Sequence, residues 1–132
     1  MCKTVHDEIE LRARPRAVYD AYLDSRSHAK FTGAPARMSR IVGRRFSAGG
    51  NYISGYNLDL VPGKRIVQAW RASEWPKGVY SVITIALRPI RNGTRLVFDQ
   101  RGIPEDVDGA STTEEWAQYY WAPLKEYLEA SG

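Results

Sequence analysis

Residues 111–128 read STTEEWAQYYWAPLKEYL, and this segment carries the clearest structural signal in the chain. Its apolar side chains recur at three- and four-residue spacing, which predicts an amphipathic helix from Glu114 to Leu128. The stripe consists of Trp116, Tyr119, Tyr120, Leu124, Tyr127 and Leu128, and the opposite side carries Glu115, Gln118, Lys125 and Glu129. We expect this long C-terminal helix to lay its aromatic stripe across a curved antiparallel sheet.

The start and the interior of this helix carry two further signals. Ser111 with Glu114 and Thr112 with Glu115 offer two overlapping capping boxes, and the pattern does not choose between them. Pro123 has no amide hydrogen, and its ring crowds the carbonyl group four residues earlier. We therefore expect a kink or a locally widened turn before Pro123.

The N-terminal part combines one strand with short helices. Near-alternating apolar residues between Val5 and Leu11 predict a strand that ends before Pro15. Proline suits a first helical turn, and apolar residues at helical spacing follow it, so a short amphipathic helix is expected over Arg16–Asp24. Ser25–Phe31 is expected to add another helical turn.

Residues 37–101 have the spacing of turns that is typical of an antiparallel meander, in which glycine- and proline-containing turns separate β-rich runs. About six strands fit between these turns. The turn at Pro62 and Gly63 leaves the register of its hairpin open, because loops of two and three residues give registers that differ by one. Ile66, Gln68 and Trp70 share one face in either register.

The pair at residues 92–93, Asn-Gly, is the strongest turn signal, since both residues tolerate the positive φ of a type I′ turn. If Arg91 faces Thr94, Leu87 lies opposite Phe98. The residues that this register places on one buried face are Ile83, Ile85, Leu87, Leu96 and Phe98.

Length and composition predict one core and one domain over residues 1–132, with 43% hydrophobic residues. Cys2 is the only cysteine, which excludes an intramolecular disulfide and favours a reducing compartment. No run of about 18 apolar residues could span a bilayer. The net charge of +4 is spread over the N-terminal half without a reading helix, so neither nucleic acid nor membrane is expected as a partner. We expect a cytoplasmic protein.

Few residue patterns point to catalysis or to a bound metal. His6 and His28 have no ligand partner at helical or strand spacing, so neither a metal nor another cofactor is expected. Four carboxylates could meet where sheet and helix join, but each also suits a turn, surface or capping role: Asp59, Asp99, Glu114 and Glu115. No catalytic residues are assigned.

The aromatic content, with four Trp and eight Tyr, is the unusual feature. It permits two interpretations, a packed core and an aromatic-lined cavity in which glutamines and tyrosine hydroxyls orient an apolar guest. The residues expected to line such a cavity are Phe31, Ile66, Gln68, Trp70, Ile83, Ile85, Phe98, Trp116 and Tyr120. Gln100 is a further candidate polar anchor.

The order of elements resembles the helix-grip, or START-like, fold, an α+β architecture. In this fold a curved antiparallel sheet of about six or seven strands wraps around a long C-terminal helix, with short helices after the first strand. The motifs resemble the C-terminal domain of the activator of heat-shock protein 90 ATPase. They are Phe31-Thr32-Gly33-Ala34-Pro35-Ala36, Ser54-Gly55, Asp59-Leu60-Val61-Pro62, Ile66-Val67 through Trp70, Trp75-Pro76-Lys77-Gly78, Arg101-Gly102-Ile103-Pro104 and Trp116-Ala117-Gln118-Tyr119-Tyr120.

This resemblance implies a cofactor-free intracellular domain with three alternative functions. The leading hypothesis is a non-enzymatic module that binds a small apolar or aromatic ligand between the C-terminal helix and the sheet. The second is a co-chaperone of the stress response that binds a chaperone of the heat-shock protein 90 type, although 132 residues leave no room for the N-terminal domain of two-domain activators. The third is an enzyme that acts on a hydrophobic substrate.

Overall fold

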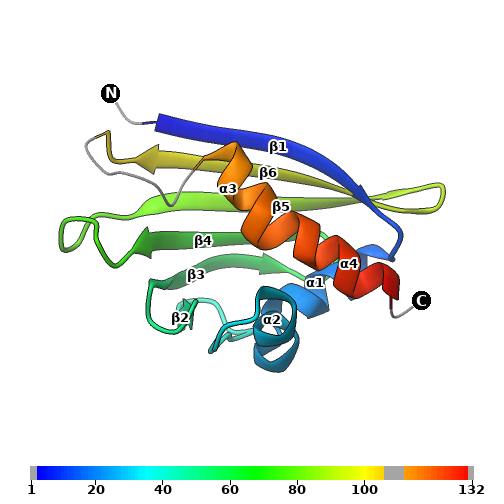
Figure 1. Ribbon diagram of the computed structural model, residues 1–132, viewed down its shortest axis with the longest axis horizontal. Helices are drawn as coiled ribbons and strands as arrows, with labels where there is room; N and C mark the ends of the chain where they lie inside the picture. The colour runs from blue at the N-terminus through cyan, green and yellow to red at the C-terminus, as the bar shows by residue number, and fades with distance from the viewer. Residues whose placement is uncertain (1–2, 106–111, 131–132) are drawn as a thin grey trace.

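A computed structural model describes residues 3–105 and 112–130. The elements in chain order are β1 (Lys3–Leu11), α1 (Pro15–Leu23), α2 (Ser25–Thr32), β2 (Arg45–Ala48), β3 (Ile53–Val61), β4 (Arg65–Ala72), β5 (Ser81–Ile90), β6 (Gly93–Ile103), α3 (Thr113–Trp116), η1 (Ala117–Trp121) and α4 (Ala122–Ala130). The strands form one antiparallel sheet in the order β1-β6-β5-β4-β3-β2. The helical run α3-η1-α4 crosses one face of this curved sheet diagonally (Figure 1). The predicted helix-grip architecture is confirmed.

The inner face of the sheet follows the alternation read from the sequence. Ile66, Gln68 and Trp70 of β4 are buried, whereas their neighbours in the strand are exposed or only partly covered. The buried face of β5 and β6 holds the predicted residues Ile83, Ile85, Leu87, Leu96 and Phe98. Period-two burial of this kind results from a strand with one face on the core and one face on solvent.

The β5–β6 hairpin differs from the predicted register. The two-residue turn is formed by residues 91–92, and Gly93 is the first residue of β6. Leu87 therefore lies opposite Leu96 and not Phe98. Gly93 stays in the strand because the last carbonyl of β1 approaches it so closely that an added Cβ atom would lie 1.9 Å from that oxygen. The partner of each residue moves by two positions, which preserves the buried face.

The β3–β4 hairpin, left open by the sequence, has a three-residue loop. Val61 pairs with Arg65, so residues 62–64 form the turn. A shift in register between Asn57 and Asp59 adds a bulge within β3. Such a bulge strengthens local twist, consistent with the curvature of this part of the sheet.

Two short helices cover one end of the inner face beside α4 (Figure 1). Pro15 is the first residue of α1, as predicted. Asp24 caps α2 by accepting a hydrogen bond from the Ser27 amide at 2.8 Å. The helix ends at Thr32, before Gly33 in the left-handed conformation. Together these helices close the core at the end where the C-terminal helix finishes.

The C-terminal helix begins with one of the two predicted capping boxes. The Thr112 hydroxyl accepts from the Glu115 amide at 3.1 Å and donates to the Glu115 carboxylate at 3.0 Å. The alternative cap at Ser111 lies outside the described residues. This run contains no helix long and apolar enough to cross a membrane, and neither does the rest of the described chain.

The widened turn expected before Pro123 is a π-helical segment, η1. Because hydrogen bonds in η1 span five residues, the residue five positions after Trp116 faces the core with it. Trp121 is accordingly 2% exposed, whereas Tyr119 is 59% exposed. The prediction that Tyr119 belongs to the buried stripe is wrong, because it assumed a regular α-helical period through this turn.

Candidate functional site

The α3-η1 segment brings a cluster of aromatic rings together on the inner face of the sheet. The Trp116 ring centroid lies 4.3 Å from that of Phe98, 5.4 Å from that of Trp70 and 4.9 Å from that of Tyr120. Offset and tilted ring pairs at these separations stabilise a core beyond their buried area. The cluster therefore fixes the helix on the sheet at β4 and β6.

One chain of buried hydrogen bonds ties this cluster to the sheet. The Trp116 indole donates to the Gln100 side-chain carbonyl at 2.8 Å, and the Gln100 amide donates to the Ser81 hydroxyl at 3.0 Å. Ser81 in turn donates to the Trp70 backbone carbonyl at 2.9 Å. Gln100, a candidate anchor for a guest molecule, thus has its polar atoms engaged within the protein.

A second buried network centres on His28, which is fully buried. His28 Nδ1 lies 2.8 Å from the Tyr22 backbone carbonyl, which can only accept, so Nδ1 carries the hydrogen. Burial lowers the pKa of His28 to about 4, partly offset by this hydrogen bond. The ring is therefore neutral near pH 7, and its Nε2 atom accepts from the Tyr120 hydroxyl at 2.9 Å.

The same network includes Gln68. The Tyr22 hydroxyl donates to the Gln68 side-chain carbonyl, and the Gln68 amide donates to the Asn57 side chain, each at 2.9 Å. Burial raises the pKa of the Tyr22 and Tyr120 hydroxyls well above the ordinary value. Both hydroxyls therefore act as neutral structural donors.

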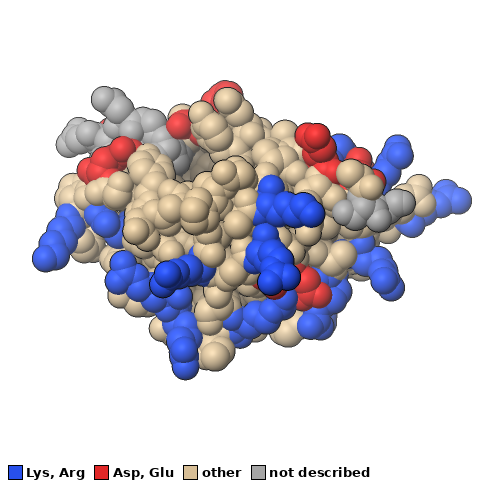
Figure 2. Space-filling model, turned by 60° about the horizontal axis from the view of Figure 1, so that its bottom comes forward, with Lys and Arg blue, Asp and Glu red and all other residues tan. Residues whose placement is uncertain are grey.

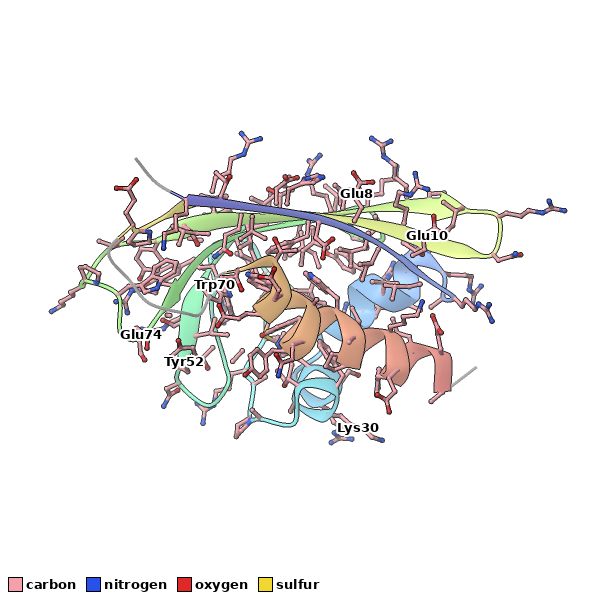
Figure 3. The ribbon with its side chains drawn as sticks, turned by 45° about the horizontal axis from the view of Figure 1, so that its top comes forward. Glu8, Glu10, Lys30, Tyr52, Trp70 and Glu74 are labelled. Carbon is pink, nitrogen blue, oxygen red and sulfur yellow. The ribbon has the colours of Figure 1, made fainter. Side chains whose placement is uncertain are left out.

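A cleft of about 370 Å³ opens beside this aromatic cluster. Its walls come from the end of α2, the turn between β2 and β3, β4 and the α3-η1 segment, and the residues that line it are Thr32, Ala34, Gly49, Tyr52, Ile53, Trp70, Glu115, Trp116, Tyr119 and Tyr120. Figure 3 shows Tyr52 and Trp70 near the start of the C-terminal helix. Most of the wall is aromatic or aliphatic, with the Thr32 hydroxyl and the Glu115 carboxylate as polar groups.

Tyr52 forms one wall of the cleft and is held by a hydrogen bond from its hydroxyl to the Glu74 carboxylate. Figure 3 labels both residues at the same end of the molecule. Burial, followed by this hydrogen bond to Glu74, raises the pKa of Tyr52 above its ordinary value. The ring is therefore a neutral and oriented surface.

Comparisons with known proteins identify the family of this chain. Residues 12–129 match the family model described as activator of Hsp90 ATPase homolog 1-like protein. The chain belongs to this family. Across 95% of its length it is 32% identical to the human activator of 90 kDa heat shock protein ATPase homolog 1, and across 86% it is 34% identical to the homologue from Dictyostelium discoideum. It spans 36% and 29% of the length of these relatives.

Solved structures of other proteins show the same fold. A crystal structure of an HSP90 activator from Plasmodium falciparum superposes with a TM-score of 0.86 at 21% identity, covering 96% of each chain. A solution structure of an Aha1 dimer from Colwellia psychrerythraea gives 0.77 at 17% identity, again covering 96% of each chain. At these identities the likeness establishes the fold.

The structure separates the nine predicted cavity residues into two groups. Trp70, Trp116 and Tyr120 line the cleft. The residues packed in the core and absent from the cleft wall are Phe31, Ile66, Gln68, Ile83, Ile85 and Phe98. Thus the centre of the helix–sheet interface is filled by side chains, and the open space lies beside it.

Most of the other lining residues were missed because they lie in connections, at the ends of elements or on the rotated helix turn. Thr32 and Ala34 belong to a motif quoted for the family resemblance, and Gly49 belongs to a glycine pair taken only as a turn. Tyr52 ends that turn and Ile53 follows it as the first residue of β3. Cleft residues of this kind could be found from the sequence only if the folded positions of these connections were known.

The candidate acidic residues do not gather into a catalytic pair. Asp59 pairs with Arg65 at 2.7 Å, and Asp99 pairs with His6 at 2.7 Å, both away from the cleft wall. Within residues 3–105 and 112–130 no group of three or more His, Cys, Asp or Glu side chains could hold a metal ion.

Proposed function

We propose that this chain is a non-enzymatic, cytoplasmic single-domain binding module that takes a small apolar or aromatic ligand in the cleft beside Trp116. The observation that carries this proposal is the cleft wall, in which the Trp70, Trp116 and Tyr120 rings are fixed by core packing and the exposed ring of Tyr119 completes the lining. Preformed aromatic walls with few polar groups are typical of small-molecule sites.

The volume and chemistry of the cleft define the ligand class. About 370 Å³ is near the lower end of small-molecule pockets, so a ligand of one or two fused rings fits better than a long acyl chain. The Thr32 hydroxyl donates its own hydrogen to the His28 carbonyl at 2.8 Å, so its oxygen and the Glu115 carboxylate offer acceptors for a single hydroxyl or amine group on such a ligand. Burial raises the pKa of the Tyr52 and Tyr120 hydroxyls in the wall, so both are neutral near pH 7, which supports binding over acid–base catalysis.

The experiment is an NMR titration of the ¹⁵N-labelled chain with 2-naphthol. We expect saturable shifts at the amides of Gly49, Ile53 and Tyr119 and at the Trp116 indole. Tyr119→Ala removes a half-exposed ring and should weaken binding by about tenfold, the equivalent of one aromatic contact. The matched control is Tyr80→Ala, which removes an exposed ring outside the cleft wall.

Two results would count against this proposal. One is the absence of saturable shifts together with the absence of any bound mass in native mass spectrometry of freshly purified protein. The other is equal weakening by the two tyrosine variants, which would show that 2-naphthol binds exposed rings without preference for the cleft.

A second candidate function is favoured by family membership. The curated relatives are named as activators of a heat-shock protein ATPase, and the identity to the human one extends over 95% of this chain. We infer, as the alternative function, that this chain binds a chaperone of the 90 kDa heat-shock type. The test measures the ATPase rate of such a chaperone with and without this chain at two salt concentrations, and an unchanged rate with no detectable complex would exclude it.

A further inference from the structure

A second and larger cleft, of about 840 Å³, lies at the corner of the sheet where β2, β3 and β4 meet the segment before β2. Its polar lining consists of three arginines, two serines and one asparagine: Arg37, Arg45, Arg71, Ser47, Ser54 and Asn51. No Asp or Glu belongs to the lining. This cleft shares no lining residue with the aromatic cleft, and its lining is basic and polar where that of the other is mostly apolar.

The sheet register brings the polar groups into a row. Ser47 lies opposite Ser54, and Ser54 lies opposite Arg71, so two hydroxyls and a guanidinium cross three adjacent strands in line. Their neighbours in each strand are buried on the inner face, which places this row on the outer face. Arg37 joins the row because its backbone pairs with Ser47.

The Arg71 guanidinium is held in place by neutral groups. Its Nη2 atom donates to the Trp75 carbonyl at 2.6 Å and to the Pro76 carbonyl at 3.3 Å, and its Nε atom donates to the Val79 carbonyl at 3.3 Å. Carbonyl partners orient the group without neutralising its positive charge. Arg71 therefore presents an oriented charge to the cleft, at little further cost in side-chain entropy.

The charges of the three cleft arginines are not compensated. In the part of the chain that the structure describes, Arg37, Arg45 and Arg71 form no ion pair. By contrast, Arg65 and Arg95 on the same sheet each pair with a carboxylate, at 2.7 and 2.9 Å.

The wider surroundings of this corner are also basic. Figure 2 brings forward the side of the molecule that carries α2 and β2, and Lys and Arg side chains spread along it with few carboxylates among them. An anion would thus meet a positive potential on approach, as well as the cleft arginines on arrival.

We propose that this cleft binds the phosphate group of a soluble small molecule. Guanidinium forks and hydroxyls are the donors that a tetrahedral oxyanion accepts from, and here they converge from four separate segments. The volume of the cleft leaves room for the rest of a phosphorylated metabolite beyond the phosphate itself.

The test is an NMR titration of the full chain with inorganic pyrophosphate at constant ionic strength. We expect saturable shifts at the amides of Arg37, Ser47 and Ser54. The variant Arg37→Gln/Arg45→Gln removes two exposed charges that make no described ion pair, and it should weaken binding by at least about tenfold. Arg71 is left intact, since its carbonyl contacts support the loop after β4.

The matched control is Arg65→Gln/Arg95→Gln, which has the same net charge and removes two arginines of the same sheet that are already paired. It should bind pyrophosphate within about twofold of the wild type, since neither residue lines the cleft. Equal weakening by both double variants would overturn the proposed site, because it would show that binding depends only on the net charge of the protein. Absence of saturable shifts would overturn the site as well. Vesicles containing phosphatidic acid test the other source of a phosphate group, and co-sedimentation of the chain with them in the absence of pyrophosphate binding would also overturn it. Binding of 2-naphthol reports on the other cleft and is independent of each of these results.

Discussion

His28 makes the stability of this protein depend on pH in a direction that can be calculated. Its folded-state pKa is about 4, below the ordinary value of 6.5, because the ring is buried. The unfolded chain therefore binds a proton more readily than the folded chain between these two values. Neutral His28 contributes its full stabilisation above about pH 6.5. That stabilisation is lost progressively as the pH falls toward 4.

The magnitude follows from the two pKa values. When the pH falls from about 7.5 to about 5, protonation of His28 in the unfolded chain lowers the free energy of unfolding by about 2 kcal/mol. His6 acts in the opposite direction. Hydrogen bonds to Asp99 and then Glu8 raise its pKa, so its contribution is present at low pH and is lost as the pH rises through the folded value.

The assay is urea unfolding of His6→Gln and His6→Gln/His28→Gln at both pH values. Using His6→Gln as the background removes the opposing titration. Replacing His28 lowers stability at every pH, since two buried hydrogen bonds are altered, so the informative quantity is the pH-dependent difference. We expect the single variant to lose about 2 kcal/mol more than the double variant on acidification. An equal loss in the two proteins would refute the conclusion that His28 is buried in its neutral form.

Two further predictions concern packing in the core. Trp116→Phe should lower the free energy of unfolding by about 1–3 kcal/mol, because it leaves a buried side-chain carbonyl without its donor, and Trp121→Phe should cost less because its indole nitrogen has no hydrogen-bond partner. Urea unfolding measures both, and equal losses would contradict the role of the hydrogen bond. Gly55→Ala should cost at least about 3 kcal/mol or prevent folding, since the added Cβ atom would lie 1.7 Å from the Ala69 carbonyl oxygen. Gly78→Ala, in open space at φ +80°, should cost about 1 kcal/mol, so similar thermal shifts for the two glycine variants would contradict this account.

Local patterns predicted the elements because each pattern depends on few neighbours. The period-two burial of β4 and the proline at the start of α1 follow from backbone geometry alone. The register of the hairpin at residues 91–92 does not follow from local geometry. Gly93 is placed by the close approach of the last residue of β1, which is distant in sequence. The faces were nevertheless predicted correctly, since the error was an even number of residues.

Residue spacing and backbone chemistry were enough to predict the helices, the buried face of the sheet and the widened turn before Pro123. They predicted about six strands over residues 37–101, where the structure has five, β2 to β6. The folded structure was needed to show that the π-turn rotates Tyr119 outward and Trp121 inward. It also decided that the centre of the interface is filled while two clefts open beside it and on the outer face. Open space depends on how distant side chains fill a shared volume, and a one-dimensional pattern does not contain that information.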